Sequence, residues 1–217
     1  MTPRAVLLDC DGVLVDSEPV AFALLAGDLA AHGLHLSRAE MEARFLGGTI
    51  TGLWKAARDL GADLPDDWVD DFYARMYARL ALGCGLIAGA EALLDRLDEA
   101  GILYAVGSNG APRKMEITMG QHPAMWARLQ DRVFSGQTLG CPKPEPGLWL
   151  HCAGFLGVAP ADCVVVDDSP SGCLGAVRAG MRCLGLAEHD DGARLASVGA
   201  EVIHRLGQVP GRIGLQP

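Results

Sequence analysis

Two aspartates, Asp9 and Asp11, directly follow the first apolar run of the chain, Ala5–Leu8. A continuous apolar run of this length is typical of a strand covered on both faces. Residues two apart on a strand point the same way, so both carboxylates can face one site just past the carboxyl end of that strand. Ligands bind at this place in open α/β sheets. A strand that simply ends in an Asp-Gly turn is the alternative interpretation.

Polar residues also follow two later apolar runs, and a lysine stands among prolines before a predicted helix. These residues are Ser108 and Asn109, Asp167 and Asp168, and Lys143. A turn or helix cap, a helix N-cap region and a solvated surface lysine are their ordinary explanations. If the strands are parallel, however, all of these residues lie on one rim of the sheet. Four carboxylates gathered there require a cation, and their hard oxygen ligands suit Mg²⁺.

The elements that must position these residues alternate along most of the chain. Strands are predicted at residues 5–8, 102–106, 132–134, 164–166, 183–186 and 202–203, with helices between them. This alternation predicts an α/β fold in which a mostly parallel sheet carries helices on both faces. Four helices without a strand signal span about residues 18–83, one of them with Ser37 and Glu40 as a capping box. We therefore predict a helical domain at 18–83 inserted into a core formed by 1–17 and 84–217.

Composition excludes several classes of protein. The chain has 217 residues, and 18 Lys+Arg against 27 Asp+Glu give a formal charge of −9. Nucleic acids and anionic membranes need a basic face, so neither is an expected partner. No apolar run reaches the ~18 residues of a membrane span, and the N-terminus has no signal-peptide pattern, so a cytoplasmic protein with reduced cysteines is expected. The side chain of Cys10 is predicted to point away from the two aspartates, and the tail from Gly207 to pack loosely.

The ordered set of motifs resembles the haloacid dehalogenase superfamily. It comprises Asp-x-Asp-Gly-Val-Leu-x-Asp-Ser, Ser-Asn after the next strand, Lys-Pro-x-Pro, and a strand ending in Asp-Asp-Ser. The helical block resembles the cap of the phosphoglycolate phosphatase and β-phosphoglucomutase branch. Asp-Cys-Asp-Gly, Ser-Asn-Gly followed by Lys114-Met115, and Val-Asp-Asp-Ser are similar to sugar phosphatases of the 6-phosphogluconate phosphatase type. The resemblance implies a Rossmann-like core and a Mg²⁺-dependent phosphatase that acts on small phosphorylated metabolites.

The resemblance also implies a role for each motif residue. Asp9 would be the nucleophile that forms an aspartyl-phosphate, and Asp11 the general acid and base. Mg²⁺ would be held by Asp9, the backbone carbonyl of Asp11 and Asp168, with Asp167 as a direct or indirect ligand. Lys143 would neutralise phosphoryl charge. The phosphate would be bound by Ser108, Asn109, Gly110 and Lys143.

Relatives place substrate-specificity residues in a cap loop that corresponds here to Arg44, Gly47, Gly48 and Thr49. Arg44 would contact an anionic or hydroxylated substrate, although an ordinary solvated arginine at a helix end is the alternative. The cap would close over the site through hinges near 13–18 and 82–85. A monomer is expected.

The residues weigh against four alternatives to a phosphatase. A phosphosugar mutase of the β-phosphoglucomutase kind would use the same core, but Ala21 stands where those mutases have a histidine. A haloacid dehalogenase proper lacks the second aspartate, which is present here as Asp11. A non-catalytic binding protein of the same fold usually loses a motif aspartate or the lysine, and all are present. The absence of GxGxxG after the first strand argues against an unrelated dinucleotide-binding protein.

Overall fold

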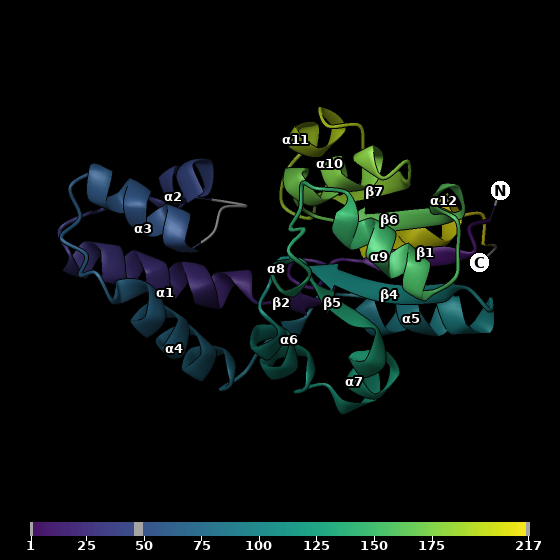
Figure 1. The fold of residues 1–217 in the computed structure, drawn as a ribbon, viewed down its shortest axis with the longest axis horizontal. Coiled ribbons are helices and arrows are strands. Elements are labelled where there is room, and N and C mark those ends of the chain that lie inside the picture. Colours follow the sequence, from purple (N-terminus) through teal and green to yellow (C-terminus); the bar gives the residue numbers. More distant parts are fainter. Residues whose placement is uncertain (1, 46–49, 216–217) are drawn as a thin grey trace. The chain divides into compact units, whose positions relative to one another are not determined.

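The first apolar run forms strand β1, which lies in the middle of a six-stranded parallel sheet (Figure 1). The computed structural model describes residues 2–45 and 50–215. The order of the strands is β5-β4-β1-β6-β7-β8, so that β1 pairs with β4 on one side and with β6 on the other. The strands are β1 (Ala5–Leu8), β4 (Leu103–Ser108), β5 (Val133–Ser135), β6 (Cys163–Asp167), β7 (Arg182–Leu186) and β8 (Glu201–Ile203).

Helices cover both faces of this sheet, as the alternating sequence predicts. Helices α9 and α10 pack on one face, where Leu7, Ala105 and Val165 belong to a core cluster with buried residues of both helices. Helix α5 packs against β4 on the opposite face (Figure 1). The helices of this part are α5 (Ala90–Glu99), α6 (Pro112–Met119), α7 (Pro123–Leu129), α8 (Gly136–Leu139), α9 (Gly147–Phe155), α10 (Pro170–Arg178), α11 (Ala193–Ala196) and α12 (Val209–Arg212).

The C-terminal tail does not pack loosely, and that prediction was wrong. A 3-10 turn at Leu206–Gln208 and helix α12 lie against α5. Leu206, Val209 and Ile213 are buried. These three apolar residues are spaced three and four apart, as on one face of a helix. Gly207, Pro210 and Gly211 between them concealed this periodicity in the sequence.

The chain separates into two compact units, Met1–Asp16 with Gly85–Pro217, and Ser17–Cys84. The first unit contains the large sheet. It also contains a short antiparallel pair, β2 (Val15–Asp16) with β3 (Gly85–Leu86), which lies beside both places where the chain crosses between the units. None of the helices in the described ranges is long and apolar enough to cross a membrane.

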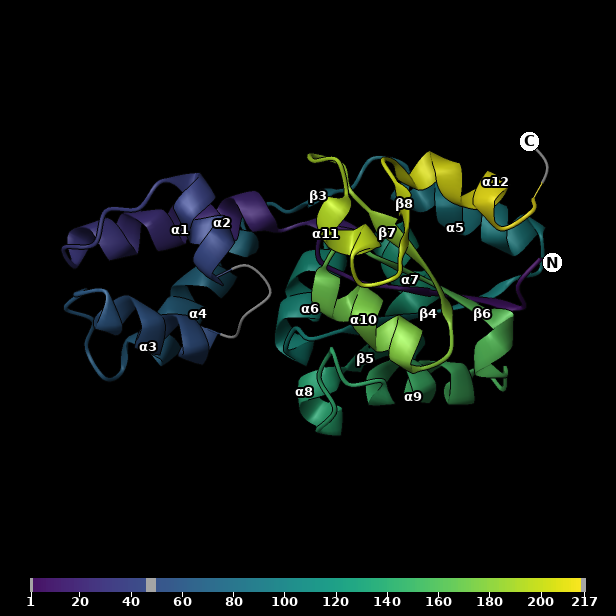
Figure 2. The ribbon, with the colours of Figure 1, turned by 90° about the horizontal axis from the view of Figure 1, so that it is seen from above.

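The second unit is helical. It consists of α1 (Glu18–Ala31), α2 (Arg38–Phe45), α3 (Ile50–Asp59) and α4 (Trp68–Leu80), with α4 packed against both α1 and α3 (Figure 2). The predicted capping box of α2 is confirmed, because Ser37 N donates to Glu40 Oε2 and Glu40 N donates to Ser37 Oγ. Trp68 and Phe72 are buried and stack on each other. Trp68 Nε1 also donates to Asp28, which is paired with Arg75.

Candidate active site

Lys143 joins two of the predicted aspartates at the carboxyl ends of neighbouring strands. Its Nζ lies 2.7 Å from Asp9 Oδ1 and 2.7 Å from Asp167 Oδ2. Asp9 directly follows β1, and its backbone N–H still donates to Val166 O of β6, so the sheet fixes its position. Asp167 is the last residue of β6. All three side chains are almost fully buried, so this is an ion triad shielded from solvent.

The backbone and the ammonium group of Lys143 are each held by one further residue. Asn109 accepts a hydrogen bond from Lys143 N at 2.8 Å and donates one to Lys143 O at 3.1 Å. The Nζ of Lys143 lies 4.5 Å from the centre of the Trp149 ring, within the range of a cation–π interaction. Trp149 is fully buried and donates from Nε1 to Gly172 O. The lysine is therefore fixed at both its backbone and its charged end.

Burial and charge act in opposite directions on this triad. Burial raises the pKa of Asp9 to about 7; Lys143 opposes the rise, and Asp167 and Asp11 add to it. Burial lowers the pKa of Lys143, but Asp167 and Asp9 outweigh this effect and the pKa is raised above its usual value. Lys143 is thus a permanent cation. Asp9 is a carboxylate whose ionised form needs more positive charge nearby than Lys143 supplies.

Asp9, Asp167 and Asp168 form a group that could hold a metal ion, with one oxygen of each lying within 4.8 Å of the others. Two glycines make room for this group. A Cβ at Gly172 would lie 1.8 Å from Asp167 Oδ2, and one at Gly12 would lie 2.1 Å from Asp168 Oδ2. Gly12 also has a positive φ of 76°, a conformation that residues with a side chain rarely adopt.

The two neighbouring aspartates of β6 are held differently. Asp167 uses both oxygens inside the protein: Oδ2 accepts from Lys143, and Oδ1 accepts from the N and Oγ of Ser169. Ser169 is in turn the N-cap of α10, where its Oγ accepts from Gly172 N. The helix-cap interpretation of this segment is therefore correct for Ser169. It does not exclude a site, since the same cap fixes the carboxylate of Asp167. Asp168 is partly exposed.

Asp11 forms an ion pair that motif spacing did not predict. Its Oδ1 lies 2.8 Å from Lys114 Nζ, and both side chains are mostly buried. Lys114 lies in the first turn of α6, directly after the loop that carries Ser108 and Asn109. The sequence shows Lys114 as one of only three lysines. A lysine in a chain this acidic, close behind a candidate site loop, is the signal that could have identified it.

The loop after β4 brings Ser108, Asn109 and Gly110 to the same rim. Gly110 N donates to Ser108 Oγ at 2.9 Å, which leaves the hydroxyl hydrogen of Ser108 able to point elsewhere. Two side chains, one from β5 and one from α8, support the loop: Ser135 Oγ donates to Gly110 O, and Gln137 Nε2 donates to Asn109 O. Helix α6 begins just after this loop, so its N-terminal end also lies beside the rim.

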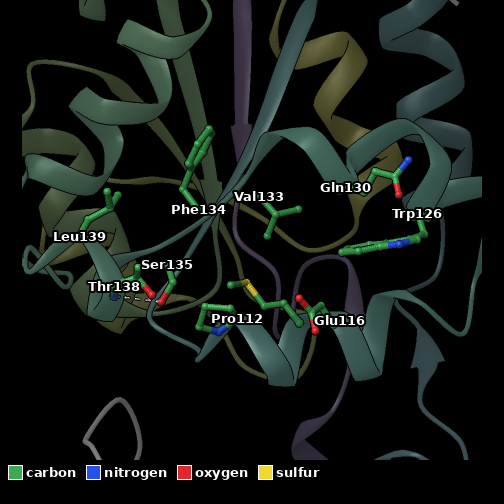
Figure 3. Close-up of a pocket in the computed structure, with 10 residues that line it drawn as sticks. Pro112, Glu116, Trp126, Gln130, Val133, Phe134, Ser135, Thr138 and Leu139 are labelled. Carbon is green, nitrogen blue, oxygen red and sulfur yellow. Dashed lines mark hydrogen bonds between the residues drawn. The ribbon is translucent and has the colours of Figure 1, made fainter.

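A pocket of about 230 Å³ lies beside this loop, between α6, α7, β5 and α8 (Figure 3). Ser135, which supports Gly110, is one of its lining residues, and Glu116 is the single charged one. Figure 3 shows Trp126 and Gln130 together on one side, with Ser135, Thr138 and Leu139 on the other. None of the predicted catalytic residues lines it. The pocket is therefore a neighbour of the candidate site rather than part of it.

Cys10 and Arg44, two other residues considered from the sequence, have different surroundings. Cys10 is fully buried, and burial together with Asp11 and Asp9 raises the pKa of its thiol well above the usual value. It stays protonated at neutral pH and is no nucleophile. Arg44 is exposed in the last turn of α2 in the second unit. Gly47, Gly48 and Thr49 lie outside the described residues.

The chain is similar to known proteins over most of its length. Residues 3–180 match the model of the haloacid dehalogenase-like hydrolases. The chain is 30% identical to hexitol phosphatase A of Escherichia coli, over 96% of this chain and 94% of that protein. It is 32% identical to 6-phosphogluconate phosphatase of the same organism, over 82% and 80%.

A solved structure shows the same fold. A haloacid dehalogenase family hydrolase from Deinococcus radiodurans, determined with bound phosphate and sodium, superposes with a TM-score of 0.81. It shares 29% identity, and the match covers 100% of this chain and 99% of that one. The parallel sheet, its rim of aspartates and lysine, and these matches lead to one conclusion: the chain belongs to the haloacid dehalogenase-like hydrolase family.

Proposed function

We propose that this protein is a Mg²⁺-dependent phosphatase that hydrolyses small phosphate monoesters, sugar phosphates or similar compounds, through an aspartyl-phosphate on Asp9. The observation that carries the proposal is the buried bridge from Asp9 through Lys143 to Asp167, with Asp168 beside it. The names of the relatives, a hexitol phosphatase and a 6-phosphogluconate phosphatase, support the substrate class.

The donor set fits Mg²⁺. Asp9, Asp167 and Asp168 offer hard oxygen ligands, and the glycines at 12 and 172 leave the space that their carboxylates need. Because both oxygens of Asp167 are already hydrogen-bonded, we assign direct ligation to Asp9, Asp168 and the backbone carbonyl of Asp11. Asp167 then acts by orienting Lys143. When bound, Mg²⁺ would supply positive charge to the phosphoryl oxygens and to the ionised nucleophile.

The residues of the chain then perform two displacements. An oxygen of Asp9 attacks phosphorus, the bond from phosphorus to the ester oxygen breaks, and Asp11 donates its proton to the departing alkoxide. Asp11 next accepts a proton from the water that attacks the aspartyl-phosphate, which releases phosphate and regenerates Asp9. Lys143 stays charged throughout and offsets the charge of the phosphoryl group, which is the main task in phosphoryl transfer.

The loop after β4 would bind the phosphoryl oxygens. Ser108 accepts from Gly110 N and so can direct its own hydroxyl hydrogen to an anion. The N-terminal end of α6 adds backbone N–H groups and the positive end of the helix dipole. Asn109 contributes its backbone amide, while its side chain holds Lys143.

We also propose that the helical second unit, predicted at 18–83, is a cap that recognises the leaving group, with the segments beside β2 and β3 as its hinges. Arg44 in α2 is its candidate for contact with an anionic or hydroxylated substrate. The proposed partner of the protein is a small phosphorylated metabolite, and the proposed assembly is a monomer.

The test is phosphate release from a panel of hexitol and sugar phosphates, 6-phosphogluconate, phosphoglycolate and p-nitrophenyl phosphate, with Mg²⁺ and with EDTA. We expect Mg²⁺-dependent release that Asp9→Asn abolishes while the far-UV circular dichroism is unchanged. Release that persists in EDTA or in Asp9→Asn would overturn the mechanism. β-Glucose 1-phosphate is included and assayed for glucose 6-phosphate, because isomerised product without free phosphate would indicate a mutase instead.

A further inference from the structure

The proposed general acid, Asp11, is held by a residue that the proposed mechanism does not use. Lys114 Nζ lies 2.8 Å from Asp11 Oδ1, with 16% of the lysine side chain and 21% of the aspartate side chain exposed. Burial lowers the pKa of Lys114, but Asp11 outweighs this effect and raises it above the usual value. Lys114 is therefore a charged partner of Asp11 at neutral pH.

Gly110 lies at the point where this pair meets the loop that carries Ser108. A Cβ built on Gly110 would lie 3.1 Å from Ser108 Oγ, 3.5 Å from Asp11 Oδ2 and 3.8 Å from Lys114 Cδ. The two oxygens of Asp11 thus face different neighbours: Oδ1 contacts Lys114, and Oδ2 lies on the side of the phosphate loop. A contact at Oδ1 fixes the rotation of the carboxyl group and so fixes where Oδ2 points.

We infer that Lys114 is a positioning residue, which holds the carboxyl group of Asp11 beside the phosphate loop so that Oδ2 can reach the oxygen of the leaving group. Proton transfer needs the two heavy atoms about 2.6–3.2 Å apart, and a displacement of about 1 Å can cost ~10²-fold in rate. Asp11 is partly exposed on a loop, where an unrestrained side chain would sample several rotamers. This inference rests on the proposed phosphatase function.

A different role for Lys114 makes a different prediction. If its ammonium group instead bound a second anionic group of the substrate, its removal would raise KM for substrates that carry such a group, whatever residue stands at position 11. If Lys114 positions Asp11, removal of Lys114 lowers the rate of hydrolysis most for esters whose leaving group must be protonated as it departs. The acidity of the leaving group therefore separates the two roles.

The experiment compares Lys114→Met and Lys114→Arg with the wild type on p-nitrophenyl phosphate, phenyl phosphate and glucose 6-phosphate. We expect Lys114→Met to lower kcat/KM about 10- to 100-fold for glucose 6-phosphate but less than about 3-fold for p-nitrophenyl phosphate, whose leaving group needs little protonation. Lys114→Arg, which keeps the charge, should recover most of the loss. Arg113→Met is the matched control, since Arg113 is an exposed cation one residue away.

A double-mutant cycle with Asp11→Asn on phenyl phosphate completes the test. If Lys114 acts through Asp11, Lys114→Met has no further effect once Asp11 is replaced. Equal losses on all three esters, or an undiminished loss in the Asp11→Asn background, would overturn the inference. The wild type and Asp9→Asn report separately on the proposed function: Mg²⁺-dependent turnover that Asp9→Asn abolishes keeps the phosphatase assignment even if Lys114 proves to have another role.

Discussion

The side chain of Asn109 holds the backbone of Lys143 at two points, because it accepts from Lys143 N at 2.8 Å and donates to Lys143 O at 3.1 Å. The loop after β4 and the loop before α9 are thereby joined by one amide group. A residue that was predicted to bind phosphate thus also fixes the position of Lys143, the candidate cation.

We predict that Asn109→Ala lowers kcat for p-nitrophenyl phosphate about 10- to 100-fold, because the displaced backbone moves the ammonium group of Lys143. Loss of two hydrogen bonds should also lower the free energy of unfolding by about 1–3 kcal/mol. Asn109→Asp keeps the acceptor and loses the donor, so its kcat should lie between those of the wild type and Asn109→Ala. Steady-state kinetics and urea unfolding measure both effects.

Gln137→Ala is the matched control for Asn109, since it removes one hydrogen bond, from Gln137 Nε2 to Asn109 O, at an exposed side chain. We expect it to change kcat by less than about 3-fold, in keeping with the small effects usual for exposed positions. If Asn109→Ala were destabilised but retained the kcat of the wild type, the two hydrogen bonds between Asn109 and the backbone of Lys143 would serve the fold alone.

Gly172 tests the packing around Asp167. A Cβ there would lie 1.8 Å from Asp167 Oδ2, and Asp167 cannot move aside because Lys143 and Ser169 hold it. Gly172→Ala should therefore lower the free energy of unfolding by about 1–3 kcal/mol, the usual cost of overpacking. It should also reduce kcat by ~100-fold or more through displacement of the triad.

Gly175→Ala provides the control within the same helix. A Cβ at Gly175 would meet its nearest neighbours, Glu145 O and two atoms of the Trp149 ring, at 3.4 Å, which is an ordinary contact. Alanine is favoured over glycine in a helix by up to ~1 kcal/mol, so this variant should be as stable as the wild type or more stable, with unchanged kcat. Thermal unfolding of the two variants side by side makes the comparison, and equal behaviour would contradict the predicted clash at Gly172.

The sheet was predictable from sequence because its strands are short apolar runs separated by helices with clear periodicity. The α/β class and the six strand positions are confirmed within one or two residues. The helical tail after Gly207 was missed, because glycines and a proline interrupt the spacing of Leu206, Val209 and Ile213. The wrong prediction rested on local composition, whereas the structure of this tail depends on its packing against α5.

The site was predictable as a set of residue types at one rim, but not as a set of contacts. Lys143 is 134 residues from Asp9 in the chain, and no local rule connects them. Spacing alone could not show that Asp167 is fully hydrogen-bonded, since its partners come from a distant loop and from the cap of α10. The pair of Lys114 and Asp11 was missed for the same reason. Pairings of this kind depend on which side chains the fold brings together.

The raised pKa of Asp9 predicts how stability changes with pH. Burial raises this pKa from 3.8 to about 7, so between pH 4 and 7 the folded protein holds a proton that the unfolded chain has lost. Stability falls with rising pH wherever the folded state binds more protons. In EDTA, the Tm of the wild type should therefore fall relative to that of Asp9→Asn as pH rises from about 5 to 8. Parallel curves for the two proteins would contradict this assignment.

Binding of Mg²⁺ should reverse this loss of stability with rising pH. The proposed Mg²⁺ ligand is the ionised form of Asp9, so binding must displace the proton below pH 7 and should be weaker there. We expect the rise in Tm on addition of Mg²⁺ to be larger at pH 8 than at pH 5.5, because a ligand that binds only the folded state stabilises it more when its affinity is higher. A rise in Tm that did not depend on pH would place Mg²⁺ elsewhere.

Trp149 separates a role in positioning Lys143 from a role in the core. The ammonium group lies 4.5 Å from the ring centre, and a buried cation–π interaction is worth ~2 kcal/mol. Trp149→Phe keeps an aromatic face but loses the hydrogen bond to Gly172 O, whereas Trp149→Leu loses both. We predict a loss of kcat below about 5-fold for the phenylalanine variant and ~50-fold for the leucine variant, because only the second removes the aromatic face that lies against the ammonium group.

Stability alone could explain such a difference, so Leu148→Ala is measured beside the two tryptophan variants. Leu148 is a fully buried neighbour in α9, and its truncation should lower the free energy of unfolding by about 2–5 kcal/mol, as much as Trp149→Leu. If Trp149 positions the lysine, kcat falls in Trp149→Leu and not in Leu148→Ala at equal loss of stability. If kcat instead follows stability in all three variants, the ring acts only as core packing, and Asp9, Asp167 and Asn109 suffice to orient Lys143.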